Sequence, residues 1–117
     1  MYKFENLIVW KKSVELAKSI YLFSEELKDF SLKDQLRRAV TSISINIAEG
    51  SGSQNDKEFK RYLYISRKSL FETLGCLKII ENIHLKQDKN IEEKIDEVGK
   101  LLNGLINKVK SDNESNS

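Results

Sequence analysis

The chain has 117 residues, a length that supports one domain with a single core and leaves no room for a second. Pro is absent and Gly occurs only 5 times, which favours long helices over turn-rich β architecture and predicts an all-α fold. The 20 Lys and Arg against 18 Asp and Glu give a net charge of +2, far from the strongly basic balance of a dedicated nucleic-acid binder.

The cellular setting is expected to be the cytoplasm. A single cysteine, Cys76, has no partner for an internal disulfide, and the amino terminus lacks the basic-then-apolar run of a secretory signal. No stretch approaches the roughly 18 uninterrupted apolar residues that a membrane-spanning helix needs. No membrane association is therefore expected.

The first helix is expected from Leu7 to about Leu27, because apolar residues recur there at steps of three and four. Its buried stripe is expected to consist of Trp10, Val14, Ala17 and Tyr21. Four further apolar residues widen this stripe, namely Leu16, Ile20, Phe23 and Leu27.

The second helix is expected from Leu32 to Gly50. Ser31, with Asp34 three residues later, fits a capping pattern in which the serine hydroxyl accepts a free backbone N–H. Residues 50–53, Gly-Ser-Gly-Ser, are expected to end the helix with positive-φ residues. The predicted buried stripe is Leu32, Leu36, Ala39, Ile43 and Ile47.

The third helix is expected to be the longest, from an N-cap at Asn55 to about His84. Asp56 and Glu58 place negative charge near the positive end of its dipole. Gly75 lies inside this helix and is interpreted as a point of close packing. The predicted buried stripe is Phe59, Leu63, Ser66, Leu70, Leu74, Leu77 and Ile80.

The fourth helix is expected from Ile91 to about Lys110, with apolar residues alternating at steps of four and three. Residues 1–110 then form one domain, and residues 111–117, which include no apolar side chain, are expected to be a disordered tail. Short connectors between long helices favour antiparallel neighbours. The predicted architecture is an antiparallel up-down-up-down four-helix bundle with left-handed packing.

No catalytic site, metal site or cofactor is predicted. Cys76 and His84 lie eight residues apart on one helix, about 12 Å along its axis, which is too far for a nucleophile and its base. Glu81 and His84 form half of a di-iron pattern, but the chain has no second half. Cys76 is expected to be a small buried apolar residue, and His84 a helix-end residue.

A polar row on the second helix has two interpretations. Arg38, Ser42 and Asn46 follow one another at steps of four, and Glu49 comes three residues later, so all four share one face. Such a row could bind a ligand. The favoured interpretation is a hydrogen-bonded network against the third helix or another subunit, since polar networks of this kind fix register and partner choice.

The third helix is the only long basic helix. Its candidate nucleic-acid-binding residues are Lys57, Lys60, Arg61, Arg67 and Lys68. Tyr62, Tyr64 and Phe71 are interleaved with them, an arrangement that suits base stacking beside a phosphate-tracking surface. The simpler interpretation is a solvated charged face beside a second buried stripe.

The first and third helices have more apolar residues than one buried face requires. This surplus is Ile8, Leu16, Ile20 and Phe23 on the first helix and Tyr64, Ile65 and Phe71 on the third. Because large exposed apolar patches mark interfaces, we expect the surplus to meet another copy of the chain. Self-association is the first functional expectation.

Two segments resemble the 23S ribosomal RNA intervening-sequence protein family. The first is Phe4-Glu5-Asn6-Leu7-Ile8-Val9-Trp10, and the second is Gln35-Leu36-Arg37-Arg38-Ala39-Val40-Thr41-Ser42-Ile43-Ser44-Ile45-Asn46-Ile47-Ala48-Glu49-Gly50. The pattern continues along the third helix with Phe59, Leu63, Ser69-Leu70 and Glu72. The chain departs from the family pattern at Phe30-Ser31, at Gln54 and at Ser66-Arg67-Lys68-Ser69. These departures affect the expected fold little, but they weaken the inference of a surface function from the family.

The resemblance implies a homopentamer of four-helix bundles around a central channel, without known enzymatic activity. It also implies genes within intervening sequences of ribosomal RNA, and a similarity to the accessory protein of diversity-generating retroelements, which binds nucleic acid and reverse transcriptase. The leading hypothesis is therefore a non-catalytic homo-oligomer that binds RNA or DNA weakly and without sequence preference. The alternative is a protein-interaction adaptor with no nucleic-acid binding.

Overall fold

Four long helices and one short helical turn make up the computed structural model, which describes the backbone of residues 2–115 and the side chains of residues 2–109. The elements in chain order are the 3-10 helix η1 (Lys3–Asn6), α1 (Ile8–Ser24), α2 (Phe30–Ser51), α3 (Asp56–His84) and α4 (Lys89–Ser115). Within the described residues no strand is formed. The predicted all-α class is confirmed.

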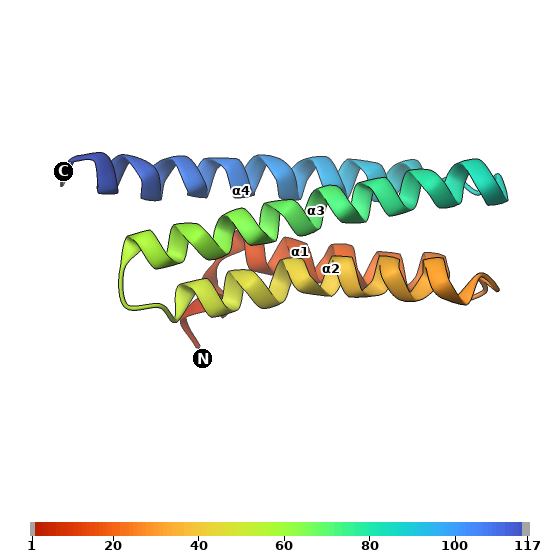
Figure 1. Ribbon diagram of the computed structural model, residues 1–117, viewed down its shortest axis with the longest axis horizontal. Helices are drawn as coiled ribbons and strands as arrows, with labels where there is room; N and C mark the ends of the chain where they lie inside the picture. Colours follow the sequence, from red (N-terminus) through yellow and green to blue (C-terminus); the bar gives the residue numbers. More distant parts are fainter. Residues whose placement is uncertain (1, 116–117) are drawn as a thin grey trace.

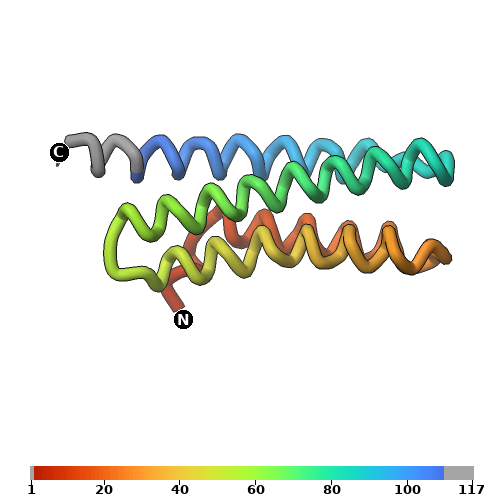
Figure 2. Tube along the Cα trace, in the orientation of Figure 1, coloured from red at the N-terminus to blue at the C-terminus, as the bar shows by residue number. Residues whose placement is uncertain are grey.

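Consecutive helices run in opposite directions and return at alternate ends of the molecule (Figure 1). The trace in Figure 2 shows three connectors, one between each pair of consecutive helices. Each helix packs against two others: α1 against α2 and α4, and α3 against α2 and α4. The helices thus form a four-membered ring around one core, while the left-handed packing stays a prediction.

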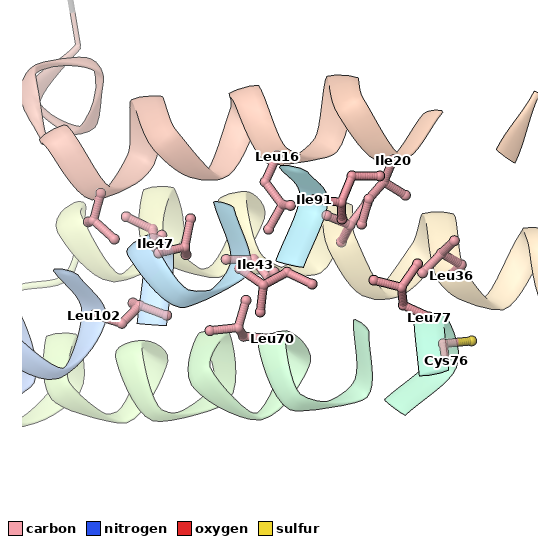
Figure 3. Packing of buried hydrophobic residues seen from close by; sticks show 14 of the residues in the cluster. Leu16, Ile20, Leu36, Ile43, Ile47, Leu70, Cys76, Leu77, Ile91 and Leu102 are labelled. Carbon is pink, nitrogen blue, oxygen red and sulfur yellow. The ribbon is translucent and has the colours of Figure 1, made fainter. Parts of the chain in front are cut away.

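Branched aliphatic side chains from all four helices fill the core (Figure 3). The side chains of Leu16, Ile43, Leu77 and Leu102, one from each helix, have no exposed surface. Burying a side chain of this size stabilises the folded chain by about 1.5–3 kcal/mol. The predicted stripe of α2 is largely buried in this core, with Leu32 at its edge. The side chains that α4 adds to the cluster are Ile91, Ile95, Val98, Leu102, Ile106 and Val109.

The buried face of α1 agrees with the prediction only in part: Leu16, Ile20 and Phe23, which widen the predicted stripe, are buried, but the four residues of the stripe itself are not. Its buried side chains are Val9, Ser13, Leu16, Ile20, Phe23 and Ser24. Trp10, Val14 and Ala17 are only half-buried, and Tyr21 is exposed. The Ser13 and Ser24 hydroxyls donate to the carbonyls of Trp10 and Ile20, at 2.7 and 2.8 Å, so both serines are satisfied inside the core.

The start of α2 also differs from the prediction. The helix begins at Phe30, and Asp29, not Ser31, is its N-cap: the Asp29 carboxylate accepts the backbone N–H of Leu32 at 3.3 Å. The same carboxylate lies 3.1 Å from Nε2 of His84, the last residue of α3. Asp29 therefore joins the α1–α2 connector to the C-terminal end of α3. No local sequence pattern identifies His84 as its partner.

The glycines of α2 do not end the helix in the predicted way. Gly52 has a φ of −89°, and no described glycine has a positive φ. Gly50 lies inside α2 and is buried, and a Cβ there would come within 2.7 Å of Tyr62 Cβ and 2.9 Å of Phe59 Cδ1. Gly50 is thus required for the close approach of α3, whereas the predicted contact at Gly75 is wrong because a Cβ there would meet open space.

Of the other helix boundaries, the start of α3 agrees with the prediction, whereas the ends of α1 and α4 do not. The Asn55 side chain accepts the backbone N–H of Glu58 at 2.9 Å, so the predicted cap of α3 is confirmed. α1 ends at Ser24, three residues before the expected end. α4 continues to Ser115 instead of ending near Lys110, since each added helical residue gains a backbone hydrogen bond. The side chains of the predicted tail, residues 111–117, lie outside the described residues.

Gly50→Ala tests the close approach of α2 and α3. We expect the added Cβ to lower the free energy of unfolding by about 1–3 kcal/mol, because it overpacks against Tyr62 and Phe59. The matched control is Gly75→Ala, where the same change meets nothing within 4 Å and adds about 1 kcal/mol of helix propensity. Urea unfolding at one fixed protein concentration measures both; equal stability of the two variants would contradict the packing role of Gly50.

Asp29→Asn tests the link between the connector and α3. The His84 side chain, and secondarily the Leu32 N–H, hold the pKa of Asp29 below its ordinary value. A lowered folded-state pKa contributes stability above the unfolded value of about 3.9, and this contribution is lost as pH falls through the folded value. We expect the variant to be less stable than the native chain at neutral pH, and the difference to disappear in acid.

Asp34→Asn is the matched control, because it removes the same charge from the same end of α2 without touching the cap. Chemical unfolding across the acid range measures both variants. If the free energy of unfolding of the native chain and of Asp29→Asn differed by the same amount at every pH, the Asp29 carboxylate would make no pH-dependent contribution to stability.

Candidate nucleic-acid interface

The first half of α3 gathers cationic side chains on one face. Steps of three and four residues place Lys57, Lys60, Arg61, Arg67 and Lys68 within one sector of the helix, opposite the stripe that enters the core. The side chains of Lys57, Arg61 and Lys68 are exposed, and those of Lys60 and Arg67 are half-buried. These five residues and Tyr64, which lies between them, are called the basic face of α3 below.

Tyr64 lies at the centre of the basic face. Lys60 Nζ is 5.7 Å and Arg67 Cζ is 4.9 Å from the centroid of its ring. Contacts of a cation with an aromatic ring at these distances are attractive, so the tyrosine holds both side chains along the helix. Tyr62 lies beside Gly50 at the contact between α2 and α3, and its ring still borders the basic face, because Arg61 Cζ is 4.6 Å from the ring centroid.

The cations of the basic face differ in their partners. Arg61 forms an ion pair with Glu58 at 2.7 Å, and this hydrogen bond raises the pKa of Arg61 and lowers that of Glu58. Arg67 donates to Oδ1 of Asn103 on α4 at 3.1 Å. Across residues 2–109, no acidic side chain forms an ion pair with Lys57, Lys60 or Lys68. These three ammonium groups can therefore bind an external anion without breaking an ion pair.

Asn103 was not identified from the sequence. Its place beside Arg67 depends on the register between α3 and α4, and no spacing within either helix indicates that register. The amide holds the guanidinium of Arg67 in place through a neutral partner. The positive charge of Arg67 is thus positioned without being neutralised.

The polar row of α2 divides into three parts. The hydroxyls of Ser42 and Ser69 lie 2.8 Å apart, and the Asn46 amide donates to the carbonyl and the hydroxyl of Ser42, at 2.8 and 3.0 Å. Ser42 thus joins α2 to α3, and Asn46 holds the Ser42 hydroxyl from within α2. Arg38 is exposed and forms an ion pair with Asp34 of its own helix at 3.0 Å.

Glu49 lies apart from the rest of this row. It lines a shallow polar hollow of about 440 Å³ at the α2–α3 turn, together with Glu58 and Tyr62. No group of three metal-ligating side chains occurs among the residues whose placement is described. The row therefore does not converge on one ligand site.

The two side chains best suited to nucleophilic chemistry have other surroundings. Cys76 is buried, as predicted, and burial raises the pKa of its thiol. His84 ends α3, as predicted, and its ring contacts Asp29 instead of the thiol. A thiol with a raised pKa is a weak nucleophile at neutral pH.

The exposed apolar surface of α1 is not the predicted one, since Leu16, Ile20 and Phe23 belong to the core. Ile8 and Leu22 are exposed, Leu22 by 80% of its surface. Leu22 borders a hollow of about 540 Å³ whose other lining residues are Val14, Ala17, Lys18 and Tyr21. Leu22 and these four lining residues are called the α1 hollow below.

Comparison with known proteins gives a family and a related structure. The family model described as 23S rRNA-intervening sequence protein matches residues 5–104. A crystal structure from Bacteroides thetaiotaomicron VPI-5482, described as a protein with unknown function from the S23 ribosomal protein family, is 31% identical. That match covers 85% of this chain and 98% of the other, with a TM-score of 0.78. No curated protein matches the chain.

In the part of the chain that the structure describes, every helix is too short or too polar to span a lipid bilayer. The four-helix architecture agrees with that of the related crystal structure over most of both chains. The match to the family model over residues 5–104 shows that this chain belongs to the 23S rRNA-intervening sequence protein family.

Proposed function

We propose that this protein is a non-catalytic homo-oligomer that binds RNA or DNA weakly, through backbone phosphates and without sequence preference. The observation that carries the proposal is the basic face of α3, where three lysines have no ion pair with any described side chain and lie beside a positioned arginine. Lysine meets phosphate as a point charge, which gives affinity without base recognition. The net charge of only +2 on one chain makes such binding weak.

Self-association is supported by the α1 hollow. Exposed apolar patches larger than a few hundred Å² are rare on monomeric soluble proteins and often mark the place where another protein binds. Among the residues of the α1 hollow, Leu22 would bury the most apolar surface against a partner, because four-fifths of its surface is exposed. A second copy of the chain is the partner that the family resemblance favours, with five copies as the expected number.

Assembly would strengthen nucleic-acid binding. Five chains, each with a net charge of +2, carry about +10 together and present five copies of the basic face. A strand that contacts several faces at once binds more tightly than one face could bind it. The family name refers to 23S ribosomal RNA, which makes RNA the first nucleic acid to test. The proposed compartment is the cytoplasm, where a lone thiol such as Cys76 stays reduced.

The alternative is a protein-interaction adaptor. Phe30 and Leu85 are strongly exposed and lie next to the α1–α2 and α3–α4 connectors, which share one end of the bundle (Figure 1). Leu85 caps α3 in the left-handed conformation, with a φ of 52°, and 91% of its surface is exposed. A partner protein that covered this side chain would remove its apolar surface from water. A complex that survives nuclease treatment would favour this function.

Neutralising the three free lysines tests the phosphate-binding face. We expect Lys57→Gln/Lys60→Gln/Lys68→Gln to weaken binding of a labelled single-stranded RNA. The slope of log K against the logarithm of the salt concentration should become less steep by about 0.7 for each phosphate that is no longer neutralised. For the native chain, neutralisation of about four phosphates predicts roughly 50-fold weaker binding when salt rises fourfold. Fluorescence anisotropy at several salt concentrations measures both quantities.

Lys3→Gln/Lys28→Gln/Lys89→Gln is the matched control, since it removes the same charge from exposed lysines outside the basic face. We expect it to bind almost as the native chain does. Equal weakening by both triple variants would mean that net charge alone drives binding. Salt-independent binding, or none at low salt, would contradict the proposed function.

Leu22→Glu tests self-association through the α1 hollow. We expect the native chain to have a mass in solution near five times 13.6 kDa, and the charged variant to have a lower mass. Leu85→Glu is the control, because it adds the same charge at an equally exposed leucine outside this hollow. Multi-angle light scattering gives the masses; an unchanged mass for Leu22→Glu would place the interface elsewhere.

A further inference from the structure

Phe71 lies four residues after Arg67, next to the basic face on α3. Lys60, Tyr64, Arg67 and Phe71 follow at steps of four, three and four, so cations and rings alternate along one line of α3. Tyr64 already carries two cations on its ring. Phe71 is 66% exposed, and among residues 2–109 neither a cation nor a second ring lies over it. Its ring is therefore free to stack against an external group.

A small apolar hollow opens beside Phe71, between α3 and α4. Its volume is about 250 Å³, and Leu70, Leu74 and Ile95 line it. Gly99 lines it from α4 and leaves space because it has no side chain. Pockets for drug-sized ligands measure about 300–1,000 Å³, so this hollow suits a single flat ring system.

Positive charge borders the hollow on both helices. Lys100 and Asn103 line it from α4, and Asn103 accepts the hydrogen bond from Arg67. Lys68 lies one helical turn before Phe71 on the same face. The one carboxylate in its lining, that of Asp96, only accepts hydrogen bonds and so suits the amino group of a base. An apolar slot between phosphate-binding cations matches one nucleotide of a polyanionic strand.

We infer that this hollow takes an unpaired nucleobase stacked on Phe71, with the adjoining phosphates at Arg67, Lys68 and Lys100. The inference rests on the nucleic-acid binding proposed above and adds that the ligand is a single strand. Bases inside a duplex are paired and stacked on each other, and cannot enter a slot in a protein without being extruded. Stacking on an aromatic ring tolerates any base, in keeping with binding that has no sequence preference.

Phe71→Leu tests the inference, with Phe30→Leu as the matched control at an exposed phenylalanine outside α3. The probes are a labelled single-stranded oligonucleotide, its duplex, and a single-stranded backbone of the same length without bases. We expect native protein to bind the base-containing strand most tightly. Phe71→Leu should weaken that binding at least about fivefold, the low end of stacking contributions, and leave binding of the abasic strand unchanged.

A second variant, Gly99→Leu, fills the hollow from α4 and should produce the same selective loss. If Phe71→Leu and Phe30→Leu bind the base-containing strand equally well, no base stacks at Phe71 and the inference is overturned. A lower mass of Phe71→Leu in solution would overturn it too, because the hollow would then be an interface between copies. Absence of all binding by native protein would overturn the proposed function as well, whereas equal binding of abasic and normal strands would overturn this inference alone.

Discussion

The close contact of α2 with α3 determines which side of α3 faces solvent. Gly50 lets the two backbones approach, and the Ser66 hydroxyl donates to the Ile43 carbonyl at 2.8 Å inside the core. The bond between Ser42 and Ser69 adds a second link near the surface. A rotation of α3 about its axis would break these bonds together. With α3 held in this way, its apolar stripe enters the core and its lysines point outward.

Much of this arrangement could be predicted from the sequence, because long periodic segments identify helices well. The four helices, the cap at Asn55 and the buried stripe of α2 all follow from spacing. The face of α1 could not be predicted, since apolar residues surround most of that helix and two buried positions are serines. Ser13 and Ser24 return their hydroxyls to the helix backbone, so a polar residue type lies in the core without cost in unpaired groups.

The basic face was also predictable in part. Steps of three and four place its five cations together whatever α3 packs against. Their partners depend on tertiary structure: Asn103 reaches Arg67 from α4, and Tyr62, which packs beside Gly50, has its ring covered by the Arg61 guanidinium. The hollow at Gly99 depends in the same way on the register of α4 against α3. The spacing along α3 thus predicts where its cationic side chains lie. Which aromatic ring stays exposed depends on how α3 packs against α2 and α4.

Protection of individual lysines from acylation when RNA is bound tests the role of α3 most directly. Mass spectrometry of the native protein, labelled with and without a single-stranded RNA, reports each lysine separately. We predict protection of Lys57, Lys60 and Lys68, with Lys28 and Lys89 labelled as before. Protection that spares the α3 lysines, or that falls evenly on all exposed lysines, would contradict the claim that the fixed orientation of α3 creates the binding surface.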